Sequence, residues 1–317
     1  MVSKVTPAVP PIPYEALDPH SQWLHIAHGQ DRHTVTEAHV RQARRAYFAM
    51  ASYVDAKIGR VLEALDQAGF ADDALVVFCA DHGEMLGERG MWFKQTFFES
   101  SVRVPLLARW PGRIAPGRCP DPCSLVDLLP TFLDAAAHGS DDRRHRVVPV
   151  DRLDGRTLLP ELLGATGTSL RDVVSEYSAE GVCAPSRMLR RGRFKYIATL
   201  GLPPMLFDLA RDPSELHDLA GRPEFADDEA ALRGRLLADW DPDRVDRRIR
   251  ASQQRRLFLR ELAMRDGDFP DWTFEARAGD RRRFVRPVSA TGAVGAKPRM
   301  RFPFVQPTPP DRPPRDP

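Results

Sequence analysis

Hydrophobic residues recur every three or four positions over a long stretch near the start of the chain. Thr34 or Thr36 suits the N-cap of a helix here, and Gly69 suits its C-terminal stop. The spacing therefore predicts a long amphipathic helix that ends near Gly69. Its apolar face consists of Val40, Ala43, Tyr47, Met50, Val54, Ile58, Val61 and Leu65. Residues 1–33 show no such period, are rich in proline and histidine, and are predicted to form an extended loop.

A continuous apolar run over residues 74–80 has the length of a strand and no polar face. We expect it to be buried on both sides, as a central strand of a parallel sheet is. A helix that leads into such a strand is typical of α/β domains, where ligands bind beyond the carboxyl ends of strands. Asp81 and His82 occupy that position. A second strand is predicted over residues 104–110.

The following segment is predicted to form a helix over residues 124–137, with Pro130 awkwardly in its interior, and a surface loop over residues 138–156. From about residue 170 the pattern changes to short strands separated by turns, which predicts a small antiparallel sheet. These strands are residues 172–177, 187–189, 194–199 and 204–208. Two further helices are predicted near residues 224–240 and 243–265.

The chain therefore divides into three predicted parts. Residues 1–165 form a partial catalytic α/β domain, residues 166–240 a sheet and helix subdomain, and residues 241–317 a helical extension with a Pro- and Arg-rich tail. The tail is either a nucleic-acid-binding arm or a solvated, subunit-wrapping extension. The net charge of only +2 favours the second interpretation, and with it homo-oligomer contacts through the tail.

Composition narrows the classes of function. The 317 residues are 42% hydrophobic, which argues against wholesale disorder, and the near-neutral charge argues against nucleic acid or an anionic membrane as partner. The sequence shows no signal-peptide h-region and no apolar run long enough for a membrane span. The four cysteines do not make a disulfide framework, and Cys119 and Cys123 lack the second ligand pair of a zinc site. We therefore predict reduced thiols and a cytoplasmic location.

The candidate chemistry lies between Asp81 and Lys94. An Asp-His pair at a strand end is often only a hydrogen-bonded turn, but Gly83, Gly87 and Gly90 form a loop that could bring backbone close to a ligand. Lys94 is either a surface lysine with a buried stem or a partly desolvated cation that faces an anion. A carboxylate and an imidazole for a metal, with a lysine nearby, suit an anionic tetrahedral ester.

This region resembles the C-terminal half of sulfatases, and choline-sulfatases most closely. The similar segments are residues 53–59, 81–90, 92–94, 97–100, 103–105, 126–131, 154–155, 175–177, 180–182, 190–196, 206–209 and 212–213, with a weaker match at 301–303. The resemblance covers most of residues 10–265. It implies an α/β fold: the C-terminal part of an alkaline-phosphatase-like α/β sandwich, with a small antiparallel-sheet (α+β) C-terminal subdomain.

The resemblance also implies roles for individual residues. Asp81 and His82 match two ligands of a divalent metal, usually calcium; many sulfatases have Asn in place of His82, so manganese is the alternative. Lys94 matches the lysine that contacts the sulfate and the leaving-group oxygen. Glu180, or else Glu176, would face the quaternary ammonium of choline sulfate, with Trp92 in an aromatic cage. The plain alternative for Glu180 is a carboxylate at a domain seam.

The nucleophile that the resemblance implies is not where the family places it. Sulfatases make formylglycine in a Cys-x-Pro-x-Arg motif near the N-terminus and bring early aspartates to the metal. Cys183-Ala-Pro-Ser-Arg187 fits the five-residue pattern, but it follows Asp81 by about a hundred residues, so we interpret Cys183 as a chance match. The chain then begins midway through the catalytic domain, and we expect it to be inactive unless the other half is supplied.

The predicted function is metal-assisted hydrolysis of a sulfate ester by a choline-sulfatase-like enzyme, lost in this truncated chain. The first alternative is a phosphodiesterase or phosphonate monoester hydrolase of the same superfamily. Residues 87–94 favour the choline-sulfatase side. The second alternative is a non-catalytic remnant, because two ligands alone should bind calcium poorly.

Overall fold

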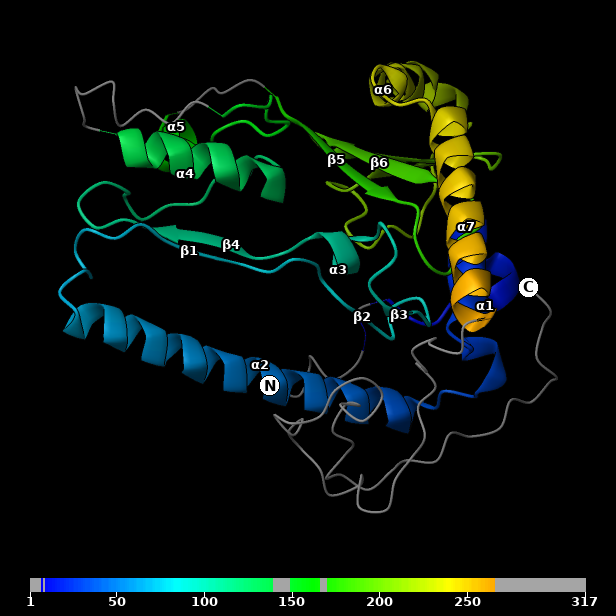
Figure 1. Ribbon diagram of the computed structural model, residues 1–317, viewed down its shortest axis with the longest axis horizontal. Coiled ribbons are helices and arrows are strands. Elements are labelled where there is room, and N and C mark those ends of the chain that lie inside the picture. The colour runs from blue at the N-terminus through cyan, green and yellow to red at the C-terminus, as the bar shows by residue number, and fades with distance from the viewer. Residues whose placement is uncertain (1–6, 8, 139–148, 166–169, 266–317) are drawn as a thin grey trace. The chain divides into compact units, whose positions relative to one another are not determined.

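The computed structural model describes residues 7, 9–138, 149–165 and 170–265 (Figure 1). The chain forms two compact units. The second unit contains nearly all of α7 (Pro242–Arg265), and the first contains the other helices and strands below. Among the described helices, none has the length and apolar character needed to cross a bilayer. Short 3-10 turns occur at Tyr14–Ala16, Gln30–Arg32, Leu125–Asp127 and Pro223–Phe225.

The N-terminal segment contains a helix that the sequence pattern did not predict. Helix α1 (Pro19–Ala27) begins after Asp18, whose carboxylate accepts a hydrogen bond from Ser21 N–H at 3.0 Å. The prediction of an extended loop over residues 1–33 is therefore wrong for this stretch. One cap and a buried Leu24 suffice for a helix that is too short to show a clear period.

Helix α2 (Glu37–Gln67) confirms the long predicted helix and its boundaries. Thr36 is the N-cap, and its hydroxyl accepts a hydrogen bond from His39 N–H at 3.3 Å while the His39 side chain accepts one from Thr36 N–H. Gly69 follows the helix with a φ of 78°, a left-handed conformation that glycine adopts without strain.

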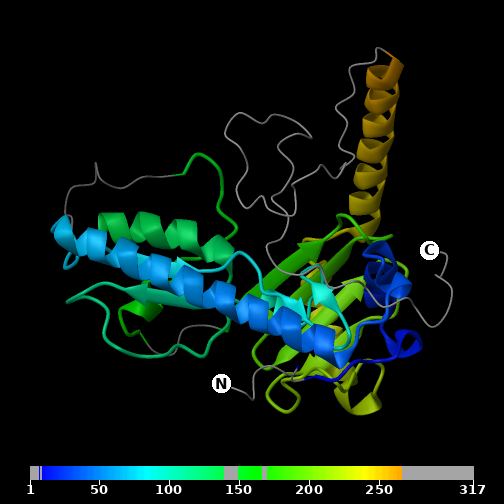
Figure 2. The same cartoon turned by 90° about the horizontal axis from the view of Figure 1, so that it is seen from below.

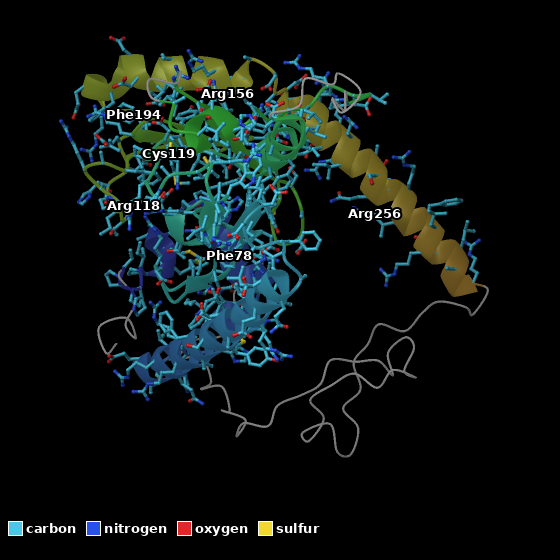
Figure 3. All side chains as sticks on the ribbon, turned by 90° about the vertical axis from the view of Figure 1, so that its left-hand side faces the viewer. Phe78, Arg118, Cys119, Arg156, Phe194 and Arg256 are labelled. Carbon is cyan, nitrogen blue, oxygen red and sulfur yellow. The ribbon has the colours of Figure 1, made fainter. Side chains whose placement is uncertain are left out.

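Strands β1 (Val76–Cys79) and β4 (Leu106–Arg109) form an antiparallel pair. Helices α4 (Leu128–Ala137) and α5 (Leu159–Leu162) lie on one side of this pair and α2 on the other (Figures 1 and 2). The prediction that β1 is a buried central strand of a parallel sheet is wrong for the described residues, where β4 is its one partner. Phe78, labelled in Figure 3, pairs with Leu107, and the two side chains are 38% and 59% exposed.

Helix α4 accommodates its proline because the helix begins only at Leu128, after a 3-10 turn. Pro130 is thus in the first turn, where no hydrogen bond is lost. Of the predicted loop over 138–156, residues 139–148 lie outside the described ranges, and residues 149–156 have no regular structure.

The predicted antiparallel sheet is confirmed. Its strands are consecutive neighbours in the order β5 (Asp172–Tyr177), β6 (Ser186–Arg191), β7 (Phe194–Thr199) and β8 (Met205–Asp208). Helix α6 (Ala226–Leu237) packs against β6 and β7. Both predicted C-terminal helices, α6 and α7, are also present.

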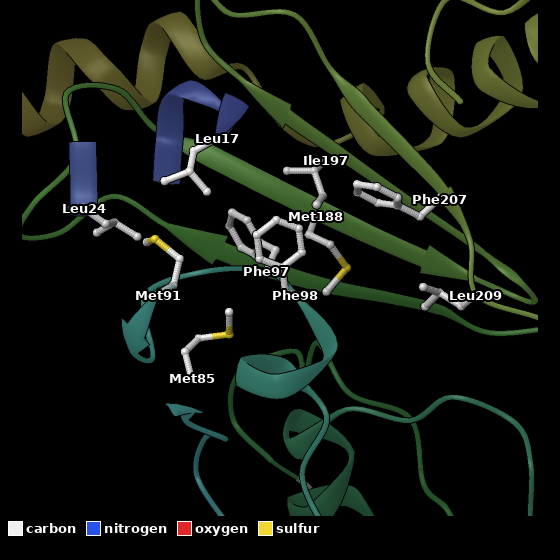
Figure 4. Packing of buried hydrophobic residues seen from close by; sticks show 10 residues of the cluster. All are labelled: Leu17, Leu24, Met85, Met91, Phe97, Phe98, Met188, Ile197, Phe207 and Leu209. Atoms are coloured by element: carbon white, nitrogen blue, oxygen red, sulfur yellow. The ribbon is translucent and has the colours of Figure 1, made fainter. Parts of the chain in front are cut away.

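The main hydrophobic core connects this sheet to the N-terminal segment and to a short hairpin, which is described below (Figure 4). Its buried side chains are Leu17, Leu24, Met85, Met91, Phe97, Phe98, Met188, Ile197, Phe207 and Leu209. A smaller cluster of Trp110, Ala135 and Leu159 joins the end of β4 to α4 and α5. The best-packed part of the first unit is therefore around the hairpin, not around β1 and β4.

Candidate active site

Asp81 and His82 lie just beyond the end of β1, in the loop that follows the strand. Asp81 Oδ1 accepts a hydrogen bond from His82 N–H at 3.0 Å, and Asp81 Oδ2 lies 3.4 Å from His82 Nε2. The Asp81 side chain is 86% exposed and the His82 side chain 34% exposed. The loop thus presents a carboxylate and an imidazole side by side to solvent.

Gly83 fixes the shape of this loop. Its N–H donates to Ser101 O at 2.6 Å, and Glu84 N–H donates to Ser100 O at 2.8 Å. Both acceptors belong to α3 (Glu99–Val102). A Cβ atom at Gly83 would lie 2.1 Å from Ser100 O, a distance that no side chain tolerates. The close approach that requires glycine is therefore between two backbone segments and not between backbone and ligand.

A two-strand hairpin returns the chain from this loop to His82. Strand β2 (Met85–Leu86) pairs with β3 (Trp92–Phe93), and Gly87 and Gly90 lie in the turn with φ values of 100° and 75°. Gly87 and Gly90, which the sequence suggested could bring backbone close to a ligand, thus form the turn of the hairpin. Met85 and Met91 are fully buried and anchor the hairpin in the core.

Glu88 ties the hairpin to α2. Its carboxylate accepts hydrogen bonds from Leu86 N–H at 2.7 Å and from Arg44 Nη1 at 2.6 Å. Arg44 also donates to Leu86 O at 3.2 Å. Both charged side chains are almost completely buried, so this pair is part of the framework and not available to a ligand.

The hairpin places Lys94 directly against His82. Lys94 Nζ lies 2.7 Å from His82 Nε2, and the lysine side chain is otherwise exposed. His82 Nδ1 lies 2.8 Å from Gly83 O, and a carbonyl can only accept, so Nδ1 carries the proton. Nε2 then holds a lone pair and accepts a hydrogen bond from the Lys94 ammonium. Asp81, His82 and Lys94 therefore form one cluster.

This cluster suits part of a metal site. The His82 Nε2 lone pair and the Asp81 carboxylate are two adjacent donors, and the Gly83 carbonyl fixes the tautomer in the way typical of metal-binding histidines. In the described ranges no group of three or more His, Cys, Asp or Glu side chains could hold a metal ion. The described chain thus offers a cation two side-chain ligands.

Glu84 adds a carboxylate next to this cluster. Burial raises its pKa, while its electrostatic interactions with the nearby His82 and Lys94 side chains and a hydrogen bond from Phe93 N–H act in the opposite direction. Glu84 in turn contributes to the raised pKa of Tyr47 on α2, after the larger effect of that phenol's own burial.

The two carboxylates that the resemblance suggested for a quaternary ammonium lie in different surroundings. Glu180 is an exposed residue in the turn after β5, where its backbone carbonyl accepts a hydrogen bond from Tyr177 Oη at 2.8 Å. The next residue, Gly181, lies against α1. Glu176 forms an ion pair with Arg187 at 3.2 Å. Trp92, the suggested cage residue, is half-buried in β3.

The Cys183–Arg187 segment leads into the small sheet. Cys183 is exposed and precedes β6, while Ser186 and Arg187 are buried in that strand. Arg187 Nη1 donates to Asp239 Oδ1 at 2.6 Å and to Leu236 O at 3.1 Å, which holds the end of α6 on the sheet. The arginine of this five-residue pattern is thus engaged in packing.

Two buried residues near the cluster were missed from the sequence. His20 on α1 bonds to the backbone of Gln95, next to Lys94, and Lys195 on β7 bonds to the carbonyl of Phe97. The capping signal of Asp18 followed by Pro19 could have revealed α1 and hence His20. A lysine in a strand ordinarily faces solvent, so the sequence alone gives no sign that Lys195 is buried.

Two family models match the chain. The model described as "Sulfatase" matches residues 17–138, and "N-sulphoglucosamine sulphohydrolase, C-terminal" matches residues 87–240. The choline-sulfatase of Rhizobium meliloti (strain 1021) is 40% identical over 285 residues, which are 89% of this chain and 54% of that protein. Arylsulfatase K of Homo sapiens is 34% identical over 197 residues, 58% of this chain and 35% of its own length. The chain thus spans about half the length of the first relative and about a third of the second.

Solved structures agree with these matches. A 2-O GAG sulfatase shares 27% identity with a TM-score of 0.60, covering 73% of this chain and 52% of that one. The phosphonate monoester hydrolase of Silicibacter pomeroyi shares 30% identity with a TM-score of 0.60, covering 73% and 49%. Both confirm the fold class that the sequence predicted.

Proposed function

The chain belongs to the sulfatase family, and from this premise we propose that it carries one part of a metal-assisted site for hydrolysis of a sulfate ester. The observation that carries the proposal is the cluster of Asp81, His82 and Lys94, with Lys94 Nζ 2.7 Å from His82 Nε2. Sulfatases generally use a divalent metal and a formylglycine. We propose that the described chain offers ligands for the first and that the second is supplied by a further part of a sulfatase domain.

In this proposal Asp81 and His82 are two ligands of the metal, calcium first and manganese as the alternative. A bound divalent cation would polarise an oxygen of the sulfate group and offset its negative charge. His82 Nε2 has a single lone pair. When His82 serves as a ligand, the Lys94 ammonium loses this acceptor and can face the anionic ester instead. There it would stabilise charge on the sulfate and on the leaving-group oxygen.

We further propose that Cys183 is not the formylglycine precursor. The place of this segment in the small sheet supports this, because its arginine, Arg187, is held by Asp239 and by the Leu236 carbonyl and is not free to serve a reaction centre at Cys183. The nucleophile would then come from a further stretch of sulfatase domain, in the same polypeptide or in another one. The chain as given would be inactive by itself.

Exposed apolar surface supports the need for that further stretch. Met50, Val54 and Val61 share one face of α2, and they are 58%, 49% and 68% exposed. The Phe78–Leu107 pair is exposed on the β1–β4 ribbon. A stable monomer rarely leaves a helix face and a strand pair of this kind in water. We propose that the rest of the sulfatase domain covers both.

For the substrate we propose a choline-type sulfate ester, with Glu180 facing its quaternary ammonium. The similarity to the Rhizobium meliloti choline-sulfatase and the exposed position of Glu180 support this. Hydrolysis of a phosphonate monoester is the second candidate, supported by the likeness to the Silicibacter pomeroyi enzyme. A cytoplasmic location and homo-oligomer contacts remain predictions from the sequence, and the tail lies outside the described residues.

Complementation would test the proposal. The chain would be co-produced with the part of the Rhizobium meliloti choline-sulfatase outside the matched region, and sulfate release from choline sulfate measured. We expect activity with the unaltered chain and a loss of about a hundredfold or more with Lys94→Ala, as for removal of a charge-stabilising group. Arg256→Ala, which removes an exposed basic side chain on α7, is the control and should change nothing.

The same complex would separate the candidates. Release of phosphonate in preference to sulfate would favour the second function. Glu180→Gln should raise KM for choline sulfate without changing KM for an aryl sulfate, because only the first carries the ammonium. Equal sulfate release by the unaltered and Lys94→Ala chains, or no release by any complex, would contradict the proposal.

A further inference from the structure

Helix α1 holds the backbone on both sides of Lys94. His20, near its start, bonds to residue 95, and His28, just after its end, stacks on residue 93. We infer that α1 is the element that positions Lys94 and that His20 is the principal positioning residue. The inference rests on the proposed function only for the chemical role of Lys94, because the position of the Lys94 side chain can be tested without any substrate.

The His20 contact is buried and has a fixed direction. His20 Nε2 lies 2.9 Å from Gln95 O, which can only accept, so Nε2 carries the proton. Nδ1 then accepts a hydrogen bond from Ser186 Oγ at 3.2 Å, and Ser186 Oγ accepts one from Thr199 Oγ1 at 2.9 Å. The chain of hydrogen bonds from Thr199 on β7 through Ser186 on β6 and His20 to Gln95 O therefore has one consistent direction of donation.

The surroundings hold the His20 ring in this orientation. The side chain is 4% exposed and packs against the rings of Phe97 and Tyr177, with centroids 5.6 Å and 6.0 Å away. Its burial favours the neutral imidazole and lowers its pKa, in keeping with the single-proton tautomer that these hydrogen bonds require. A rigid, neutral donor thus reaches the carbonyl directly after Lys94.

The second flank is held by aromatic stacking. The His28 ring lies 4.8 Å from the Phe93 ring at an angle of 31°, and His28 Nδ1 donates to Leu24 O at 2.7 Å. Phe93 has a φ of 71°, a left-handed conformation that an aromatic residue adopts only when its surroundings impose it. The stack on α1 supplies such a constraint.

Residue 94 needs these anchors because its own contacts are few. Its side chain is exposed, its N–H donates to Gln95 Oε1 at 3.1 Å, and the hairpin that leads to it has only two residue pairs. Without the two flanking contacts the Lys94 ammonium would lose its defined place 2.7 Å from His82.

The test measures how Lys94 reacts and not what the chain hydrolyses. A limiting amount of an amine-acylating reagent would be added to the full chain, and the modification of Lys94 relative to Lys57 quantified by peptide mass spectrometry. In the unaltered chain, the bond from Lys94 to His82 should slow acylation. His20→Phe keeps the ring but loses both hydrogen bonds, and we expect the Lys94 to Lys57 ratio to rise about fivefold, which corresponds to one lost hydrogen bond.

Two further variants and a control variant complete the test. His20→Gln keeps a donor toward Gln95 O, so its ratio should stay within about twofold of the unaltered chain. His28→Ala removes the stack from a half-buried position, should fold even if His20→Phe does not, and should also raise the ratio. His33→Gln, an exposed histidine, is the matched control. If His20→Phe folds and its Lys94 to Lys57 modification ratio is unchanged, the inference is wrong. If His20→Phe does not fold, an unchanged ratio in His28→Ala has the same meaning. Neither outcome depends on whether complementation restores hydrolysis.

Discussion

At the scale of single residues, the loop after β1 depends on Gly83. Its N–H bond to Ser101 O and its contact distance to Ser100 O leave no room for a Cβ atom. The conformational freedom of glycine is not what matters here, since Gly83 has no left-handed φ. Its small size is what lets the loop touch α3.

We therefore expect Gly83→Ala to destabilise the chain by about 1–3 kcal/mol, the usual cost of forcing an atom into a packed site. Gly59→Ala is the matched control. Gly59 lies within α2 with open space around it, so alanine there should stabilise the chain by about 0.5–1 kcal/mol. Urea denaturation of both variants measures the change in the free energy of unfolding, which should be negative for Gly83→Ala and positive for Gly59→Ala. A neutral Gly83→Ala would mean that α3 yields to the new methyl group.

His20 provides a pH prediction. Burial lowers its pKa below the ordinary value of 6.5, so between the two values the unfolded chain binds more protons than the folded one. The free energy of unfolding should therefore fall as the pH drops through 6.5 and keep falling until the folded pKa is reached. His20→Gln lacks this dependence. Denaturation from about pH 7.5 to about pH 5.5 should show a smaller loss of stability for His20→Gln than for the unaltered chain.

The sequence predicts some residues of the candidate site better than others. Asp81 and His82 could be singled out because they directly follow a predicted strand, and Lys94 because it follows the glycine-rich segment that resembles sulfatases. The capping signal at Asp18 marks the helix that carries His20, but the role of His20 could not be predicted, because its partner Gln95 is 75 residues away and no local pattern records that contact. The roles of Asp81, His82, Lys94 and Glu180 stay predictions until they are measured.

At the scale of elements, α3 connects the loop of Gly83 to the small sheet. Glu215 Oε2 accepts a hydrogen bond from Glu99 N–H at 2.8 Å, which satisfies a donor at the start of α3. Glu215 Oε1 and Glu99 Oε1 each lie 2.7 Å from Lys195 Nζ, and Phe97 O lies 2.8 Å from it. The lysine is fully buried, so it depends on these partners.

Glu215→Ala should therefore cost about 3–5 kcal/mol, because it leaves a buried ammonium with one carboxylate and uncaps α3. His217→Ala removes an exposed imidazole whose Nδ1 lies 3.3 Å from Asp212 Oδ2 and should cost less than about 1 kcal/mol. Thermal denaturation of both variants compares the loss of a buried carboxylate with the loss of an exposed imidazole two residues away. Similar costs for the two variants would show that Lys195 finds another partner.

Elements with a long period or clear turns were predicted well, as α2 and strands β5–β8 illustrate. Helix α1 was missed because nine residues are too few to show a helical period. The direction of β1 was predicted wrongly because an apolar run carries no information about its neighbours: β4 pairs with it antiparallel. The three-part division of the chain stays a prediction.

At the scale of the whole molecule, the first unit exposes large apolar side chains on one face of α2 and on the β1–β4 pair. They differ from the hairpin core, where every member of the main cluster is buried. Surface of this kind promotes association in water and binds apolar dyes.

Val61→Glu together with Leu107→Glu should leave the free energy of unfolding within about 0.5 kcal/mol, since both side chains are already exposed. The same double variant should bind less of an apolar fluorescent dye and should fail in the complementation assay. Glu63→Gln, an exposed polar position on α2, is the control for both measurements. Full complementation by the double variant would show that another surface receives the co-produced part of the choline-sulfatase.

The bond between Glu215 and Glu99 also has a consequence for the order of synthesis. The two residues are 116 positions apart, and a ribosome releases the earlier one first. Until the later one emerges, α3, whose carbonyls hold Gly83, lacks its cap, and Lys195 has only one of its two counter-charges. The cluster at Asp81 is therefore completed late in translation, and a chain interrupted before Glu215 carries the same residues without their arrangement.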